Sequence, residues 1–193
     1  MRTFVAALAA GLGWLAPVAH AQDQQQNDED AALWCVYEAL TASLDYEVVA
    51  EAYLIDGDLT GDPEGILARA GKTCAQTHGL NEAQQIATME YARFGSIIDY
   101  LTEELMFEGV TEDQITAIFL ATDSISDEDY ASLYEEGWQA TDVGARVKAE
   151  LLKAQFPDDI DFVDTAMQIM GLIVRADEAE MVYVFASDDV DAN

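Results

Sequence analysis

The chain has 193 residues, of which 38 are acidic and 8 are Lys or Arg, so its formal net charge is −30. This charge excludes nucleic-acid binding as a function, because such binding depends on Lys and Arg neutralising phosphates, and it disfavours anionic membrane surfaces. Hydrophobic residues make up 51% of the chain, which is too many for a disordered acidic polypeptide and enough for a sizeable core.

The first 21 residues predict a secretory signal peptide. Arg2 gives a positive start, residues 4–17 form an uncharged apolar run, and Ala19 and Ala21 place small residues at positions −3 and −1 of a cleavage site. Cleavage between Ala21 and Gln22 would leave the mature chain outside the cytoplasm, so we expect a periplasmic or secreted protein. An uncleaved anchor is the alternative, but the apolar run is shorter than the about 20 residues of a membrane span. We therefore expect no stable membrane insertion after cleavage.

Removal of the signal peptide would leave 172 of the 193 residues, a length that suits one domain. Arg2 is the one basic residue in the removed segment, so seven Lys or Arg would remain beside all 38 acidic residues. We divide the mature chain into a flexible polar leader (22–27), an all-helical domain (28–186) and an acidic tail (187–193).

Nearly every segment of the domain has apolar residues at helical spacing. The expected helices cover 28–44, 45–53, 62–79, 81–109, 141–155 and 160–174, and two further helices start at Thr111 and Ser126. No strand pair is indicated. The sequence therefore predicts an all-α, single-domain fold, an irregular bundle of six to eight helices.

Helix-start signals support several of these boundaries. Asn81 and Thr111 each stand three residues before a Gln, the spacing of a capping box. Asp62 is expected to be an N-cap, with Pro63 at the first helical position. The composition of residues 181–185 suits a strand, but a lone strand would leave its backbone groups unpaired, so we expect these residues to extend the last helix.

Cys35 and Cys74 are the only cysteines, and in an oxidising compartment such a pair predicts a disulfide, here between two early helices. Cys35 shares a helical face with Ala31 and Ala39, a stripe of small residues that would let another helix approach. Closing a loop of about 40 residues should stabilise the fold by about 4 kcal/mol. A redox pair is the alternative, but redox cysteines usually stand close together, as in C-x-x-C. His78, four residues after Cys74, permits a shared metal site; a histidine placed in a last helical turn by the helix dipole is the favoured interpretation.

Asp56, Asp58, Thr60 and Asp62 resemble the start of a Ca²⁺-binding EF-hand loop, with Gly61 at its sixth position. The match ends there, because Pro63 occupies the eighth position and Leu67 stands where the bidentate Glu belongs. These four residues are therefore weak metal-site candidates, and a turn before the next helix explains them equally well. No other metal site and no cofactor is expected.

The pairing of Trp34-Cys35 with a later Cys74-Ala75-Gln76 resembles the small acid-stress chaperones of the bacterial periplasm. Those proteins are much shorter and far less acidic, and we carry no residue role over from them.

No motif for nucleophilic catalysis or phosphate binding is present, and the sequence identifies no catalytic residue. We expect an exported, soluble helical protein that acts without catalysis, through binding, interaction or a role in envelope stress. Its acidic surface would steer it towards a basic envelope protein or peptide. The alternatives are a Ca²⁺-responsive binding protein and a hydrolase that uses a pair of carboxylates.

Overall fold

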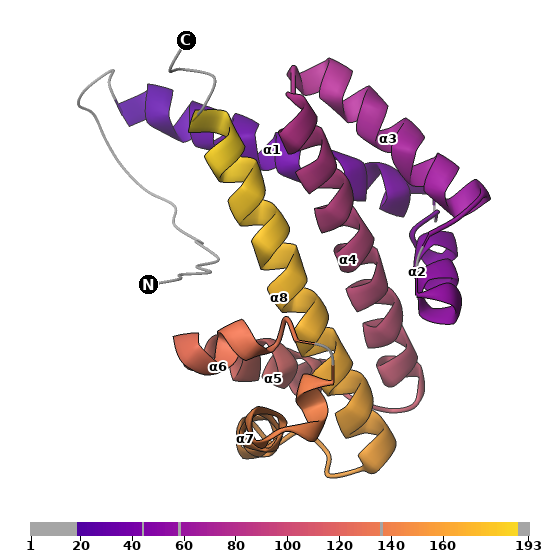
Figure 1. The fold of residues 1–193 in the computed structure, drawn as a ribbon, viewed down its shortest axis with the longest axis vertical. Coiled ribbons are helices and arrows are strands. Elements are labelled where there is room, and N and C mark those ends of the chain that lie inside the picture. Colours follow the sequence, from indigo (N-terminus) through magenta and orange to yellow (C-terminus); the bar gives the residue numbers. More distant parts are fainter. Residues whose placement is uncertain (1–18, 44, 58, 136, 189–193) are drawn as a thin grey trace.

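The computed structural model describes residues 19–43, 45–57, 59–135 and 137–188, and within them the chain forms eight α-helices and one 3₁₀ helix (Figure 1). The helices are α1 (Ala19–Ser43), α2 (Asp45–Asp56), α3 (Asp62–His78), α4 (Glu82–Phe107), α5 (Glu112–Asp123), α6 (Asp127–Ser132), η1 (Trp138–Ala140), α7 (Asp142–Lys153) and α8 (Ile160–Asp188). The all-α prediction and the bundle-like arrangement are confirmed.

The two longest described helices, α4 and α8, run antiparallel at the centre of the fold (Figure 1). Large aliphatic side chains fill the space between them, including Ile97 of α4 and Met170 and Val174 of α8, all fully buried. Asn81, the N-cap of α4, donates a hydrogen bond from its side-chain amide to the carbonyl oxygen of Ala186 at 3.1 Å. This bond ties the start of α4 to the end of α8.

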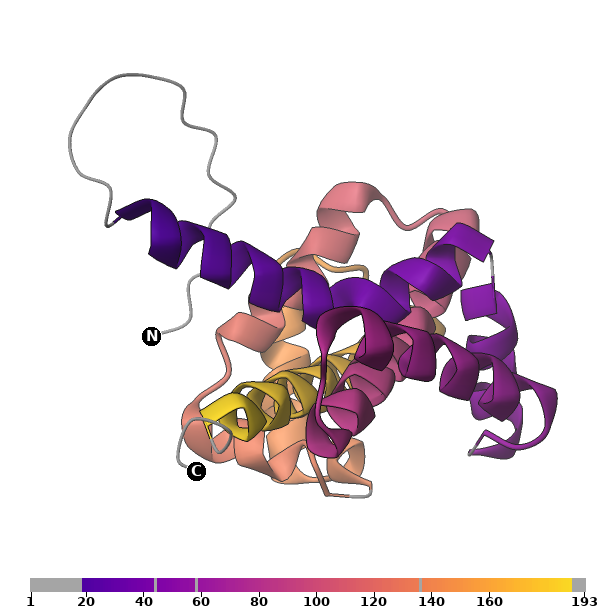
Figure 2. The ribbon, with the colours of Figure 1, turned by 90° about the horizontal axis from the view of Figure 1, so that it is seen from above.

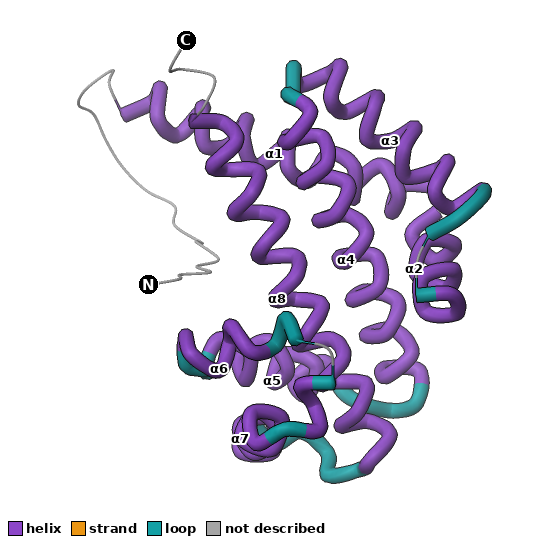
Figure 3. Tube along the Cα trace, viewed as in Figure 1, coloured by secondary structure: helices purple, strands orange, loops and turns teal. Residues whose placement is uncertain are grey.

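The other helices form two groups on this central pair, joined by short loops (Figure 3). Helices α1, α2 and α3 all pack on α4, and α1 lies across the central pair (Figure 2). Helix α2 lies beside the C-terminal half of α4, where Tyr46 bonds to Glu103. Helices α5 to α7 gather around the N-terminal half of α8 (Figure 1). Each group has its own apolar interior: Val36, Leu40 and Val49 in the first, and Ile118, Leu133 and Val147 in the second.

The predicted helix starts are confirmed in three of four places. Asn81 and Thr111 form complete capping boxes, and the Ser126 side chain accepts a hydrogen bond from the backbone N–H of Asp129 at 3.2 Å. The prediction that Asp62 is an N-cap is wrong. Gly61, with φ of 70°, caps α3, and Asp62 is the first helical residue, where its charge still favours the positive end of the helix.

Residues 181–185 extend α8, as expected, although their composition suits a strand. Tertiary contacts explain the helix: Tyr183 is 4% exposed and packs with Ala32, Leu33 and Ala87 of α1 and α4. Helix α8 runs on to Asp188, so the segment expected to be an acidic tail begins inside a helix, and 189–193 lie outside the described residues.

The segment 22–27, expected to be a flexible leader, belongs to α1 in the structure. Helix α1 begins at Ala19 and meets no Gly or Pro up to Ser43, while Gln and Glu are good helix formers. The predicted cleavage residues Ala21 and Gln22 therefore stand in the first turn of α1. Residues 1–18, which hold most of the predicted signal peptide, lie outside the described residues. No described helix has the length and apolar character that a membrane crossing requires.

The predicted disulfide is confirmed: Cys35 of α1 and Cys74 of α3 are bonded, with their Cα atoms 5.9 Å apart. The prediction that the small-residue face of α1 contacts α3 is wrong, because Ala31 and Ala39 on that face are exposed. The contact instead uses the neighbouring face of α1, whose large residues reach a buried cluster that includes Cys74. Burial of aliphatic side chains, and not a stripe of small ones, brings the two helices together.

Candidate functional site

Tyrosine hydroxyls bind several carboxylates at the contacts between helices of this acidic protein. They donate hydrogen bonds to carboxylates on other helices in three places: Tyr37 to Asp99, Tyr46 to Glu103 and Tyr130 to Asp177. With only 8 Lys or Arg for 38 acidic residues, most carboxylates have no basic partner to pair with. A neutral donor satisfies a half-buried carboxylate without the desolvation of a second charge.

The pKa directions agree with this role. Burial raises the pKa of Asp99, and the nearby charge of Glu103 adds to the rise, while the hydrogen bond from Tyr37 opposes it. Burial and the bond to Asp99 raise the pKa of Tyr37, and the bond to Glu103 raises the pKa of Tyr46 to about 12. These tyrosines therefore stay protonated donors at neutral pH. Asp99 is not among the residues that line either of the cavities described below.

A cavity of about 450 Å³ lies between the α5–α6 turn and α8. We call it the acidic-aromatic cavity, and its lining consists of two carboxylates, two tyrosines and small or apolar residues: Thr122, Asp123, Ile125, Asp127, Tyr130, Ala131, Tyr134 and Met181.

Local sequence places the two carboxylates at this cavity. Asp123 ends α5, the Ser126 cap starts α6, and Asp127 is the first residue of α6, so the short turn brings both aspartates to one side. Both are exposed, and neither has a recorded ion pair among the described residues. The negative charge at the cavity is therefore open to solvent and to a ligand.

Helix α8 holds the two tyrosines in place. The hydroxyl of Tyr130 donates to Asp177, and that of Tyr134 donates to the carbonyl oxygen of Val174 at 3.3 Å. With their hydroxyls bound to α8, the two rings stand edge to face, their centroids 6.5 Å apart. Two oriented aromatic rings beside two exposed carboxylates form a surface that attracts an organic cation, because the faces of aromatic rings are electron-rich.

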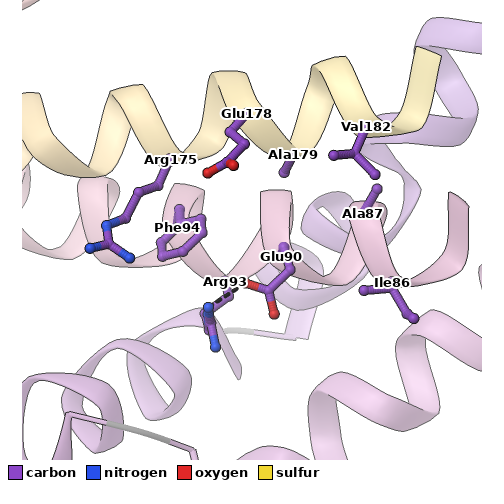
Figure 4. Close-up of a pocket in the computed structure, with 9 residues that line it drawn as sticks. All are labelled: Ile86, Ala87, Glu90, Arg93, Phe94, Arg175, Glu178, Ala179 and Val182. Carbon is purple, nitrogen blue, oxygen red and sulfur yellow. Dashed lines mark hydrogen bonds and ion pairs between the residues drawn. The ribbon is translucent and has the colours of Figure 1, made fainter. Parts of the chain in front are cut away.

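A smaller groove of about 240 Å³ lies between α4 and α8 (Figure 4). We call it the arginine groove, because two of the few basic residues meet there. Its lining consists of two arginines, two glutamates and five apolar residues: Ile86, Ala87, Glu90, Arg93, Phe94, Arg175, Glu178, Ala179 and Val182.

Arg93 is held by its neighbours on α4 and α2. It pairs with Glu90, and its guanidinium lies 4.7 Å from the ring centroid of Phe94 and 5.4 Å from that of Tyr53. Arg175 is exposed, and it has no hydrogen bond or ion pair with any residue of the described chain. One fixed and one unpaired arginine therefore border the same apolar groove.

Of the four EF-hand-like residues, only Thr60 and Asp62 have side chains among the described residues, so the Ca²⁺ site stays a prediction. Asp56 ends α2, Thr60 is exposed in the following loop and Asp62 begins α3, while Asp58 and the side chain of Asp56 lie outside the described residues. Across the described part of the chain, no group of three acidic, His or Cys side chains is placed to hold a metal ion.

His78 is the last residue of α3 and is exposed, which matches the interpretation from the helix dipole. The alternative of a metal site shared with Cys74 requires a thiolate, and the sulfur of Cys74 is bonded to that of Cys35.

Sequence reasoning missed both cavities. The four-residue spacing of Tyr130 and Tyr134, just after the acidic start of α6, is a local signal that could have indicated an acidic aromatic surface. No local signal places Met181 opposite them, or Arg175 beside Arg93. No protein-family model, curated protein or solved structure matches this chain.

Proposed function

We propose that this is an exported, non-catalytic binding protein whose acidic-aromatic cavity takes a basic side chain of a partner peptide or protein. The observation that carries the proposal is the cavity itself, in which Asp123 and Asp127 stand beside the rings of Tyr130 and Tyr134. Export rests on the predicted signal peptide, and the Cys35–Cys74 bond is compatible with an oxidising compartment.

Long-range charge would bring such a partner to the surface. A formal net charge of −30 attracts a basic protein over about one Debye length, a distance that grows as the salt concentration falls. This attraction raises the rate of association more than the final affinity. Net charge alone would not select one place on the surface. The cavity supplies that selection because it combines charge with shape.

Contacts inside the cavity would hold the basic side chain. A Lys or Arg head group near the tyrosine rings gains about 0.5–2 kcal/mol from cation–π attraction. The apolar stem of the same side chain can pack on Ile125 and Met181, since long basic side chains bury their methylenes while their charge stays near water. The exposed carboxylates of Asp123 and Asp127 then face the charge.

A binding experiment with matched variants tests this proposal. The probe is acetyl-hexalysine amide, with acetyl-hexaserine amide as the uncharged control, titrated calorimetrically at 25 and 250 mM NaCl. The cavity variant carries Asp123→Asn and Asp127→Asn. The control carries Glu38→Gln and Glu108→Gln, which removes the same charge from exposed positions outside the cavity.

We expect hexalysine to bind and hexaserine not to bind, with affinity falling steeply at the higher salt concentration. The cavity variant should bind about tenfold more weakly than the control variant, a difference of about 1.4 kcal/mol. Equal weakening of the two variants would show that net charge attracts the peptide without a site, and would contradict the proposal.

The Ca²⁺-responsive protein and the carboxylate hydrolase remain predictions. Calcium titration monitored by calorimetry tests the first. Turnover of glycoside, ester or peptide substrates, lost on substitution of a single Asp or Glu, would establish the second.

A further inference from the structure

The arginine groove has two chemically different ends. Figure 4 shows Arg93 and Arg175 towards one end, and Ile86 and Val182 towards the other. The apolar end extends over exposed side chains: Ile86 is 50% exposed, Val182 46%, and Phe185, one turn further along α8, 67%. A molecule with a charged head and an apolar body would match both ends.

The charge of the head group follows from the pairing in the groove. Glu90 is already paired with Arg93, whereas Arg175 has no recorded ionic partner in the described chain. The unpaired Arg175 places a positive charge in the groove of a protein that has 38 acidic residues. This positive charge favours a ligand with an anionic head group. The carboxylates of Glu90 and Glu178 line the same groove, so a monoanion fits better than a multiply charged group such as a phosphate dianion.

The size of the groove limits the apolar part to one chain. Seven residues separate Arg175 from Val182, a distance of about 10 Å along the helix axis. The volume of about 240 Å³ lies below the range of drug-sized sites, which begins at about 300 Å³. A two-chain lipid would not fit, and an anionic bilayer would be repelled by the net charge.

We propose that the arginine groove binds a monomeric single-chain fatty carboxylate. Its head group lies by Arg175 and Arg93, and its chain lies over Ala179 towards Ile86 and Val182. This site is independent of the acidic-aromatic cavity, shares no lining residue with it and takes a ligand of opposite charge.

The test uses decanoate below its micelle concentration, with decanol as the uncharged control, followed by calorimetry and by thermal unfolding. The head-group variant is Arg175→Gln. Its matched control is Arg69→Gln, which removes an exposed arginine on α3, outside the groove. The chain variant is Val182→Asn. Arg175 and Val182 are exposed, so both variants should fold, and circular dichroism checks this.

We expect saturable binding of decanoate that raises the melting temperature of the wild type and of Arg69→Gln, because a ligand of the folded state stabilises it. Arg175→Gln should bind decanoate about tenfold more weakly and decanol unchanged. Val182→Asn should weaken both ligands. Hexalysine binding should be the same in Arg175→Gln and Arg69→Gln, which separates this proposal from the previous one.

Three results would overturn the proposal. Equal decanoate affinity in the two arginine variants would remove the role of the head group. Decanol binding as tightly as decanoate to the wild type would do the same. A steady fall in melting temperature with added decanoate, without saturation, would show surfactant unfolding in place of a site.

Discussion

Removal of the Cys35–Cys74 bond should lower the stability of the protein substantially. The bond joins α1 to α3 across 39 residues of sequence, so its loss frees a long segment of the unfolded chain. The perturbation is the double variant Cys35→Ala/Cys74→Ala, which leaves no free thiol to react.

Loop length gives the magnitude. In the chain-entropy model, a loop of this length contributes about 4 kcal/mol to the free energy of unfolding. Cys74 is 2% exposed within the α1–α3 cluster, so removing its sulfur atom adds a packing loss of about 1 kcal/mol. For a domain of this size each kcal/mol shifts the melting temperature by about 2–4 °C. The double variant should therefore melt about 10–20 °C below the wild type.

Calorimetric unfolding of the mature protein measures this shift. Wild type in reducing buffer is the control, because it loses the bond but keeps both sulfur atoms; it should fall nearly as far as the double variant. A double variant that melts within about 1 °C of the oxidised wild type would contradict a stabilising role for the bond. The unfolded chain would then already be restricted, and the bond would add nothing.

Two single substitutions and the N-terminus of the exported protein give three further predictions. Asp99→Asn should raise the stability of the protein at pH 7, and it should flatten the decline of stability that the wild type shows in denaturant titrations as the pH rises above about 4. The pKa of Asp99 is raised in the folded state, so the folded protein holds this proton more tightly than the unfolded chain, and wild-type stability falls as the pH rises above the unfolded pKa. The amide oxygen of Asn can still accept the hydrogen bond from Tyr37. A variant that is less stable than the wild type at pH 7 would contradict this prediction. Gly144→Ala should lower the free energy of unfolding by about 1–3 kcal/mol in the same titration, because the added Cβ would lie 2.2 Å from the carbonyl oxygen of Gln139. An unchanged denaturation midpoint would show that the backbone moves to make room for the Cβ. N-terminal sequencing of protein from the cell envelope should begin at Gln22, and a retained Met1 would disprove cleavage.

Local signals predicted the helices well because the interactions that set their ends are local. The capping boxes of Asn81 and Thr111 span three residues each, so residue type and spacing are enough to recognise them. The start of α3 was misjudged because it depends on the positive φ of Gly61, which composition alone does not determine. The end of α8 is helical because Tyr183 packs in the core, against the strand preference of its neighbours.

The tyrosine–carboxylate bonds and the arginine groove could not be predicted because they depend on contacts between distant residues. Tyr37 and Asp99 are 62 residues apart, and Tyr130 and Asp177 are 47 apart. With 38 acidic residues in the chain, no pattern marks which carboxylates meet a tyrosine. The arginine groove likewise depends on the antiparallel register of α4 and α8, which a bond from Asn81 to Ala186 helps to set.

The most direct test of the proposed function is the map of backbone amide chemical shifts when acetyl-hexalysine amide is titrated into the isotope-labelled mature protein. We expect the largest shifts at the residues that line the cavity, and we expect them to saturate together with one affinity: Asp123, Asp127, Tyr130, Tyr134 and Met181. Small shifts spread evenly over the acidic surface, or a concentration of shifts on another face, would contradict it.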